Sequence, residues 1–238
     1  MLFWLLIWQL GSIALGNEIL LVSPLRVLIE LVQLAQTETF WLSIAYSLQR
    51  IAIGFGLALA AGILLAALAA RFGWLEELLK PLVLTIKSIP VASFIILVLI
   101  WFPSRSLSVI ISFLMVMPIL YTNVMAGIRA TDQKLKDMAT VFQLSPARII
   151  RYIYVPQAMP FFQSGCAVAL GLCWKAGIAA EVIGIPQGSI GEKLQQAKVY
   201  LATPELFAWT LVIVLVSLAF EKTVLALVRL AAKTLERV

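Results

Sequence analysis

Long runs of apolar residues alternate with short polar segments along the whole chain. Because a membrane-spanning helix needs about 20 mainly apolar residues, runs of this kind predict helices that cross a bilayer. We predict spans at about residues 2–15, 41–70, 81–102, 107–127, 158–180 and 204–227, the first of them short. The pattern therefore predicts an all-α fold, a polytopic membrane helix bundle of about six transmembrane helices.

The composition supports a membrane protein. Of the 238 residues, 62% are hydrophobic and 13% are charged, and the mean hydropathy is +1.02. Soluble domains average about 45–50% apolar and about 25% charged residues. We expect one transmembrane domain over residues 1–238. No basic segment or cleavage site accompanies the first apolar run, so we expect a retained span rather than a removed signal peptide.

Two features of the predicted spans bear on how they pack. Small residues recur every four positions in the second span and form a ridge, which lets a neighbouring helix approach closely. The ridge consists of Gly54, Ala58, Gly62, Ala66 and Ala70. In the third span, Ile89-Pro90 predicts a kink or an unwound turn, because proline lacks an N–H and disfavours helical geometry in the preceding residue. We interpret Cys166 and Cys173 as apolar filling, not as a disulfide or metal pair.

A basic segment between the fourth and fifth predicted spans sets the orientation. Residues 128–157 contain five basic and two acidic residues, the largest positive excess in the chain. Because Lys and Arg collect in cytoplasmic loops, we place this segment in the cytoplasm and attribute the net charge of +6 to orientation, not to nucleic-acid binding. Six spans would place both termini in the cytoplasm. Ser145 and Pro146 predict the start of a helix that ends before Pro156.

The spacing of residues within this segment carries a resemblance to a known family. The relevant positions are Asp137, Met138, Ala139, Gln143, Ile153, Val155 and Pro156. They resemble the cytoplasmic coupling motif of ATP-binding-cassette importer permeases, which has Glu-Ala-Ala, three residues, Gly, nine residues, Ile, one residue and Leu-Pro. The spacing is kept throughout, and Gln143 stands where the motif has Gly.

Further segments resemble the nitrate, sulfonate, taurine and bicarbonate branch of these permeases, and the likeness covers about residues 45–235. They are Ser88-Ile89-Pro90, residues 99–102, residues 180–184 and residues 188–191. The resemblance implies a permease subunit, not an enzyme, in the bacterial cytoplasmic (inner) membrane. It implies a second permease copy, two cytoplasmic ATPases and an extracytoplasmic solute-binding protein, with a small anionic solute. ATP and Mg would bind to the partner ATPases, and this chain would hold no cofactor.

The residues themselves favour an external energy source. The chain has no Gly-rich phosphate loop ending in Lys and Ser or Thr, so we expect no ATP hydrolysis by this chain alone. A short helix can dock in a partner's groove through apolar anchors at three- and four-residue spacing, as Leu144, Ala147 and Ile150 provide. The alternative is an ordinary turn held at lipid headgroups by its basic residues. The candidate ATPase-coupling residues are Asp137, Ala139, Gln143, Leu144, Ser145, Pro146, Ala147, Arg148, Arg151 and Pro156.

Ionisable residues inside a span are costly and usually functional, so they are candidates for a solute pathway. Lys175 lies within the fifth predicted span and either attracts an anionic solute or forms a buried ion pair. Glu181, near the outer end of that span, either lines the pathway or holds the next stretch by accepting backbone N–H groups. Arg50 is expected to pair or to snorkel near the interface. Ser88 and Pro90 complete the candidate pathway residues.

Two other classes of function stay open. A secondary carrier or a channel would work without an ATPase, and such carriers often have inverted repeats and an acid for proton coupling. No repeat is visible in the sequence, and acids are few within the apolar runs. A membrane enzyme would need clustered Asp, His, Cys or Ser groups at bilayer depth; the chain has no His, and we predict no metal site.

Overall fold

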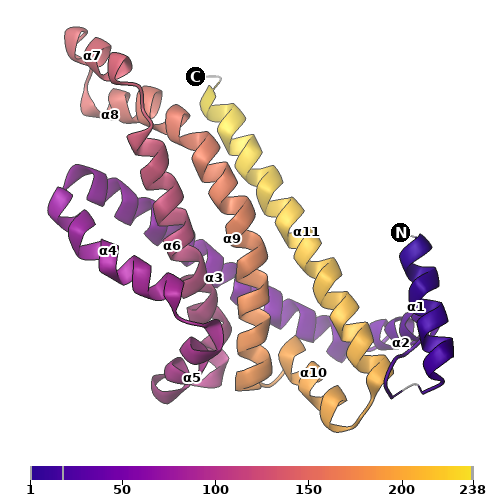
Figure 1. Ribbon diagram of the computed structural model, residues 1–238. Coiled ribbons are helices and arrows are strands. Elements are labelled where there is room, and N and C mark those ends of the chain that lie inside the picture. The colour runs from indigo at the N-terminus through magenta and orange to yellow at the C-terminus, as the bar shows by residue number, and fades with distance from the viewer. Residues whose placement is uncertain (1, 18, 237–238) are drawn as a thin grey trace.

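The computed structural model describes residues 2–17 and 19–236, which are mostly helical and contain no strand. The helices of Figure 1 are α1 (Leu2–Leu15), α2 (Pro24–Ala35), α3 (Glu38–Arg71), α4 (Gly73–Ser88), α5 (Val91–Trp101), α6 (Leu107–Arg129), α7 (Gln133–Val141), α8 (Pro146–Ile149), α9 (Val155–Gly184), α10 (Ile190–Val199) and α11 (Thr203–Glu236). A 3₁₀ turn, η1 (Ser104–Ser106), precedes α6, and a π-helical turn, η2 (Ile150–Tyr154), joins α8 to α9. The predicted all-α membrane bundle is confirmed.

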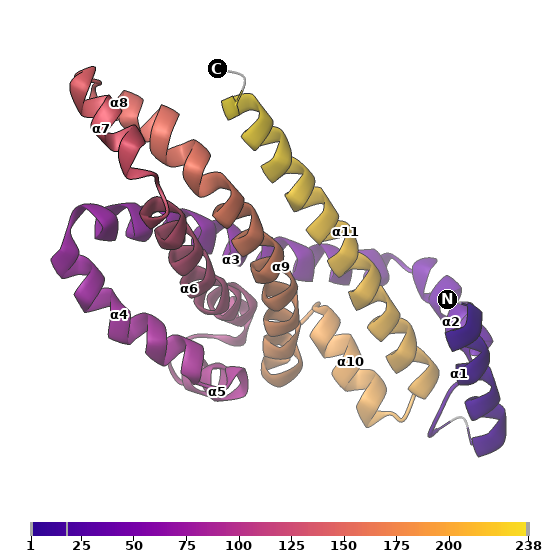
Figure 2. The ribbon, with the colours of Figure 1, turned by 45° about the horizontal axis from the view of Figure 1, so that its top comes forward.

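Three long helices, α3, α6 and α9, form the centre of the bundle, and α6 packs against both of the others (Figures 1 and 2). Helix α11 packs along α9, while α4 and α5 contact α6 from the other side. Ile111 and Leu120 of α6 and Leu170 of α9 are almost completely buried in this core. The core therefore joins helices that are far apart in the sequence.

The predicted ridge of small residues brings α3 and α6 into backbone contact. A Cβ atom on Gly54 would lie 2.6 Å from the carbonyl oxygen of Val109, and one on Gly62 would lie 2.9 Å from Cβ of Leu120. Neither position has room for a side chain unless the helices move apart. The close approach that the spacing predicts is therefore confirmed at these two glycines.

The far end of this ridge departs from the prediction. Ala58 and Ala66 are buried, but Ala70 is exposed and Ala69 is buried in its place. Each step of four residues turns a position by about 40° around the helix axis, since an α-helix has about 3.6 residues per turn. The ridge has therefore rotated away from α6 by the time it reaches Ala70.

Four segments are long and apolar enough to cross a membrane. They are Glu38–Arg71, Ser104–Arg129, Pro146–Gly184 and Thr203–Lys233, and the α4–α5 pair makes a fifth if it is one broken span. Helix α1 has 14 residues and is about 21 Å long, which is shorter than the hydrocarbon core of about 30 Å. The described residues therefore account for four or five of the roughly six predicted spans, and α1 is too short to count with them.

The predicted third span is broken rather than straight. Its halves, α4 and α5, meet at 108° across Ile89-Pro90, where the sequence predicts a kink or an unwound turn. Ile89 adopts φ −80° and ψ 131°, the extended conformation that a following proline favours. Helix α4 also begins at Gly73, well before the predicted start at residue 81. Its buried residues include Leu79 and Val83, which lie one turn apart on the same face of the helix.

The helix that begins at Pro146 does not end before Pro156, which corrects the prediction. It continues through η2 into α9 as one segment of 39 residues, Pro146–Gly184. In η2 the N–H of Val155 donates to the carbonyl of Ile150, five positions earlier. A proline ring clashes with the carbonyl four residues before it in a regular α-helix, and the wider π turn relieves that clash.

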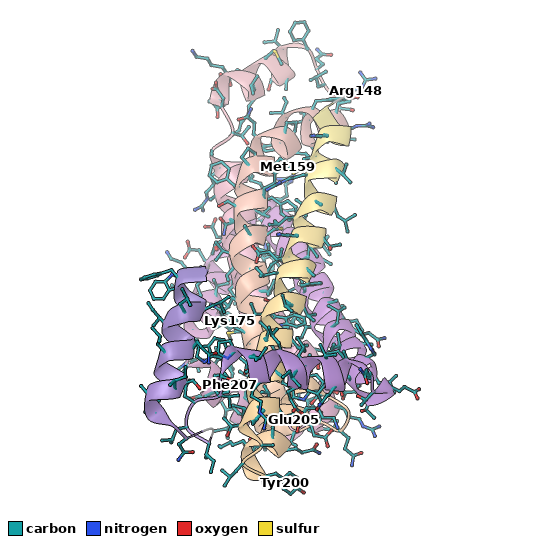
Figure 3. The ribbon with its side chains drawn as sticks, turned by 90° about the vertical axis from the view of Figure 1, so that its right-hand side faces the viewer. Arg148, Met159, Lys175, Tyr200, Glu205 and Phe207 are labelled. Carbon is teal, nitrogen blue, oxygen red and sulfur yellow. The ribbon has the colours of Figure 1, made fainter. Side chains whose placement is uncertain are left out.

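The two ends of the bundle differ. Helices α7 and α8 and the C-terminal part of α11 lie at one end, which we call the loop end, and α5 and α10 lie toward the opposite end (Figure 1). Figure 3 places Arg148 at the loop end, Tyr200 at the opposite end and Lys175 between them. The candidate coupling and pathway residues therefore occupy different levels along the bundle.

Candidate functional site

Helix α7 ends in a tight turn that is built around Gln143. The N–H of Leu144 donates to the carbonyl of Ala139 at 3.0 Å, and the N–H of Gln143 donates to the carbonyl of Thr140 at 3.1 Å. These two bonds define a Schellman motif, in which one residue adopts the left-handed conformation. Gln143 is that residue, with φ 50°. It therefore takes the conformation that glycine adopts at lower cost, which explains why the family motif has Gly there.

Helix α8 begins where the sequence predicts. Ser145 precedes it in an extended conformation, with φ −64° and ψ 150°, and Pro146 occupies the first turn. The Ser145 side chain makes no capping hydrogen bond. Arg148 and Arg151 are both exposed, and the Arg151 guanidinium lies over the ring of its neighbour Tyr152, 5.6 Å from the ring centroid. The two arginines therefore flank the helix as expected.

Apolar side chains are exposed at the loop end. Val141 is 79% exposed, Phe142 is 70% exposed and Ile150 is 57% exposed. Ala147 is exposed as well, whereas Leu144 is half-buried in the Schellman turn. We call Val141, Phe142, Ala147 and Ile150 the apolar loop surface. Two of the three predicted anchors, Ala147 and Ile150, belong to it, and Leu144 does not.

The sequence prediction missed Val141 and Phe142, the two most exposed members of this surface. A usable signal was present, because two large apolar residues stand together at the end of an otherwise polar helix. The remaining candidates lie elsewhere. Asp137 is exposed and accepts a hydrogen bond from Gln133 Nε2 at 2.9 Å, Ala139 is buried, and Pro156 is half-buried.

Glu181 is completely buried and connects four helices. Its Oε2 accepts hydrogen bonds from Ser47 Oγ at 2.6 Å and from the N–H of Gly191 at 3.3 Å, and its Oε1 accepts one from Ser108 Oγ at 3.0 Å. Ser47 Oγ in turn accepts the N–H of Ile190 at 3.0 Å. The carboxylate thus holds the start of α10 against α3, α6 and α9. Its hydrogen bond from the backbone N–H of Gly191 agrees with the alternative in which Glu181 holds the stretch after α9 by accepting backbone N–H groups.

The two cations singled out by sequence have different surroundings. Lys175 is exposed on α9 and forms no hydrogen bond or ion pair with another described residue, while its neighbours Trp174 and Ala176 are buried. No ion pair of the predicted kind is therefore present within the described part of the chain. Arg50 donates to the carbonyl of Arg105 and lies 4.3 Å from the ring centroid of Tyr46.

No group of three or more His, Cys, Asp or Glu residues in the described ranges is placed to hold a metal ion. Cys166 and Cys173 are buried free thiols on α9. They fill the core, as the sequence interpretation expects.

A cavity of about 490 Å³ lies at the break between α4 and α5, and we call it the bend cavity. It is lined by residues 86–91 together with Met115, Pro118, Ile119 and Leu172. The predicted pathway residues Ser88 and Pro90 are part of this lining, and Glu181 is not. Lys175 follows Leu172 by three positions on α9, so it leaves that helix on nearly the same face, one turn closer to the opposite end.

A second cavity of about 400 Å³ lies between α4 and α6, on the loop-end side of the bend cavity, and we call it the groove. Its lining is Glu76, Lys80, Val83, Leu84, Lys87, Tyr121, Thr122, Met125, Ala126 and Arg129. Lys87, which the sequence prediction omits, lines both cavities, and its Nζ lies 3.2 Å from Thr122 Oγ1. Arg129 and Glu76 form an ion pair.

The chain matches a known family of membrane transport proteins. The family of binding-protein-dependent transport system inner membrane components matches residues 58–237. The chain belongs to this family. It is accordingly a multi-pass inner-membrane permease component, and the resemblance found in the sequence is confirmed.

Similar proteins include permeases for small solutes. The taurine transport system permease protein of Escherichia coli (strain K12) is 25% identical over 228 residues, covering 93% of this chain and 82% of that protein. The nitrate import permease protein of Synechococcus elongatus is 29% identical over 199 residues, covering 79% and 71%. A solved amino acid ABC transporter shares the fold, with a TM-score of 0.56 at 19% identity over 81% of this chain and 94% of that one.

Proposed function

We propose that this chain is the membrane-spanning subunit of an ATP-driven importer. It would work with a second copy of itself, two cytoplasmic ATPases and an extracytoplasmic solute-binding protein. The observation that carries the proposal is the apolar loop surface, which is exposed at the loop end, on α7 and on the first turns of the long segment Pro146–Gly184. Large apolar side chains that gather at one exposed end of a protein favour a binding role, and a docked ATPase would cover these. The alternative, a turn held at lipid headgroups by its arginines, does not account for the exposure of Val141 and Phe142.

The connections of the loop support mechanical coupling. Helix α8 continues through η2 into α9 as one helix, and α7 follows α6 after a turn of three residues, Ala130 to Asp132. A displacement of the loop by a partner would therefore act on α6 and α9 directly. Both helices line the bend cavity, so the same displacement would change the shape of that cavity. Alternating access would follow from this movement, with ATP and Mg²⁺ bound and used on the partner ATPases.

The solute we propose is a small oxyanion. The relatives named above are permeases for taurine and nitrate, both of which carry oxyanion groups. The groove contains three basic residues and one acid, and the acid, Glu76, is paired with Arg129. Lys80 and Lys87 are left to give the groove a positive charge, which suits an anionic solute.

The orientation we propose places the loop end in the cytoplasm, in agreement with its basic residues. The C-terminal part of α11 lies at the same end (Figure 1), so the C-terminus would also be cytoplasmic. A cytoplasmic N-terminus, as the sequence predicts, would require α1 to cross the bilayer, and its 14 residues are short for that.

The test is Ala147→Asp in the complete transporter, reconstituted with its ATPase and binding protein. A carboxylate placed on the apolar loop surface would have to be desolvated on docking, so we expect ATP-driven uptake to be lost. The matched control is Ala130→Asp, at an exposed alanine of the same segment that lies outside this surface. Normal uptake by Ala147→Asp would contradict the proposal. ATP-independent uptake by the chain alone, with no ATPase recovered on purification, would favour a carrier or channel instead.

A further inference from the structure

On the basis of the proposed function, we infer that Lys87 is the solute-binding cation of the pathway. Its ammonium group would bind an oxyanion group of the solute in the space that Lys87 lines, and Thr122 of the groove would position it. Four observations support this role: a broken helix that lines a cavity, a cation without a carboxylate partner, the presence of that cation in the lining of two cavities, and other cations at further levels of the bundle.

The break in the α4–α5 span indicates that the bend cavity has a functional role. Irregular backbone at membrane depth occurs only where protein covers it or where it lines a water-filled space, because lipid cannot satisfy its polar groups. Pro90 is exposed at this break, and residues 86–91 all line the bend cavity. Its volume of about 490 Å³ is ample for a small oxyanion with some of its water.

Lys87 lies at this break without a neutralising partner. An ammonium group has three N–H donors, and the one contact of Lys87 among the described residues is the 3.2 Å bond to Thr122 Oγ1. Thr122 is itself held by its hydroxyl, which lies 2.8 Å from the carbonyl of Pro118. The acid of the groove, Glu76, is engaged by Arg129. Lys87 is exposed in the last turn of α4, and a cation without a carboxylate partner among apolar spans commonly marks an ion or substrate path. A passing anion would supply the missing charge.

The position of Lys87 distinguishes it from the other cations. It is the basic residue that lines both the bend cavity and the groove, so its ammonium group is within reach of a solute in either. The groove then leads past Lys80 toward Arg129 at the loop end. On the other side, Lys175 lies one turn beyond Leu172 of the bend cavity. The cations thus lie at successive levels along the bundle, and Lys87 is the one that lines both cavities.

The experiment replaces the charge within one protein preparation. Lys87→Cys is purified with its ATPase and reconstituted with the binding protein, and uptake of labelled taurine and nitrate is measured. The preparation is then treated with 2-aminoethyl methanethiosulfonate, which restores an ammonium group, or with the sulfonatoethyl reagent, which installs an anion. We expect Lys87→Cys to lose about tenfold or more in uptake rate, the effect of one lost hydrogen bond to a charged group. The ammonium reagent should recover most of this loss, and the sulfonate reagent none.

Two controls make each outcome decisive. The unsubstituted transporter treated with the same reagents should be unaffected, because Cys166 and Cys173 are buried. Lys222→Cys, an exposed lysine of α11 outside both cavities, should transport normally with either reagent. Equal uptake by Lys87→Cys and the unsubstituted transporter would overturn the role of Lys87 while leaving the importer intact. Failure of the unsubstituted transporter to take up any oxyanion with ATP would instead reject the proposed function.

A lipid phosphate could offer the same chemistry as the solute, so the measurement is repeated in two kinds of vesicle. In phosphatidylcholine alone, a solute-binding Lys87 should show the same loss and recovery as in vesicles that also contain phosphatidylglycerol. A headgroup contact would make uptake by the unsubstituted transporter depend on phosphatidylglycerol, and Lys87→Gln would remove that dependence. This second result would overturn the inference.

Discussion

Ser47 Oγ donates a hydrogen bond of 2.6 Å to Glu181 Oε2, although the two residues are 134 positions apart, and both are almost fully buried. The same carboxylate accepts hydrogen bonds from Ser108 and from the backbone of Gly191. A buried polar group is stable only when its hydrogen bonds are made inside the protein. Glu181 is therefore a structural centre for the end of the bundle opposite the loop, where α10 packs on the long helices.

Glu181→Ala should destabilise the protein strongly. It would leave two buried hydroxyls and one backbone N–H without their acceptor, and each unsatisfied group costs about 1–3 kcal/mol. We expect a clearly lower melting temperature for the detergent-solubilised protein, and a smaller decrease for Glu181→Gln, which keeps one oxygen acceptor. Glu77→Gln, at an exposed acid on α4, is the control and should melt as the unsubstituted protein does. A melting temperature unchanged in Glu181→Ala would rule out this structural role.

Gly54 and Gly56 on α3 provide a matched pair for testing the contact between α3 and α6. A methyl group on Gly54 would lie 2.6 Å from the carbonyl oxygen of Val109, while one on Gly56 would meet no atom within 4 Å. We expect Gly54→Ala to cost about 1–3 kcal/mol through overpacking, and Gly56→Ala to be neutral or slightly stabilising. Thermal unfolding of the two variants, side by side, measures the difference. Equal stability would mean that α6 moves aside without cost.

Much of the fold is predictable because the responsible forces are local. Runs of apolar residues identify the long helices, small residues at four-residue spacing identify the face of α3 that meets α6, and Ile89-Pro90 marks the broken span. Pro156 shows the limit of such rules. A proline ends many helices, but here the π-helical turn η2 accommodates Pro156 within one continuous helix. Whether the helix ends or continues at such a proline depends on how α9 packs along its whole length.

The candidate site is less predictable because it depends on tertiary contacts. Lys87 is one of 18 basic residues in the sequence, and its importance follows from the two cavities that it lines. The sequence leaves both a pathway role and a structural role open for Glu181, and the hydrogen bonds from Ser47 and Ser108 depend on the packing of three helices. The exposure of Phe142 likewise depends on the turn that follows it, which folds Leu144 back against α7.

Gln143→Gly should stabilise the loop. A left-handed conformation costs a residue with a side chain about 1 kcal/mol more than glycine, and Gln143 has φ 50°. We expect slower hydrogen exchange at the amide of Leu144, whose bond to Ala139 closes the turn. Gln143→Val should have the opposite effect, since branched side chains tolerate this conformation poorly. As a control, Met138→Gly places glycine within α7 and should speed exchange there by weakening the helix. Faster exchange in Gln143→Gly would show that the side chain itself supports the turn.

Replacement of both Val141 and Phe142 by Ser should weaken ATPase binding without destabilising the permease. The two side chains are 79% and 70% exposed, so their loss removes little packing within the chain. Each large apolar side chain buried against a partner contributes about 1.5–3 kcal/mol, so the double variant should bind the ATPase at least about tenfold more weakly. The amount of ATPase recovered with the purified permease, together with the melting temperature of the permease alone, measures both effects. Tyr200→Ser is the control, because that residue is 80% exposed but lies at the opposite end (Figure 3). Undiminished recovery of the ATPase with the double variant would move the docking site away from the apolar loop surface.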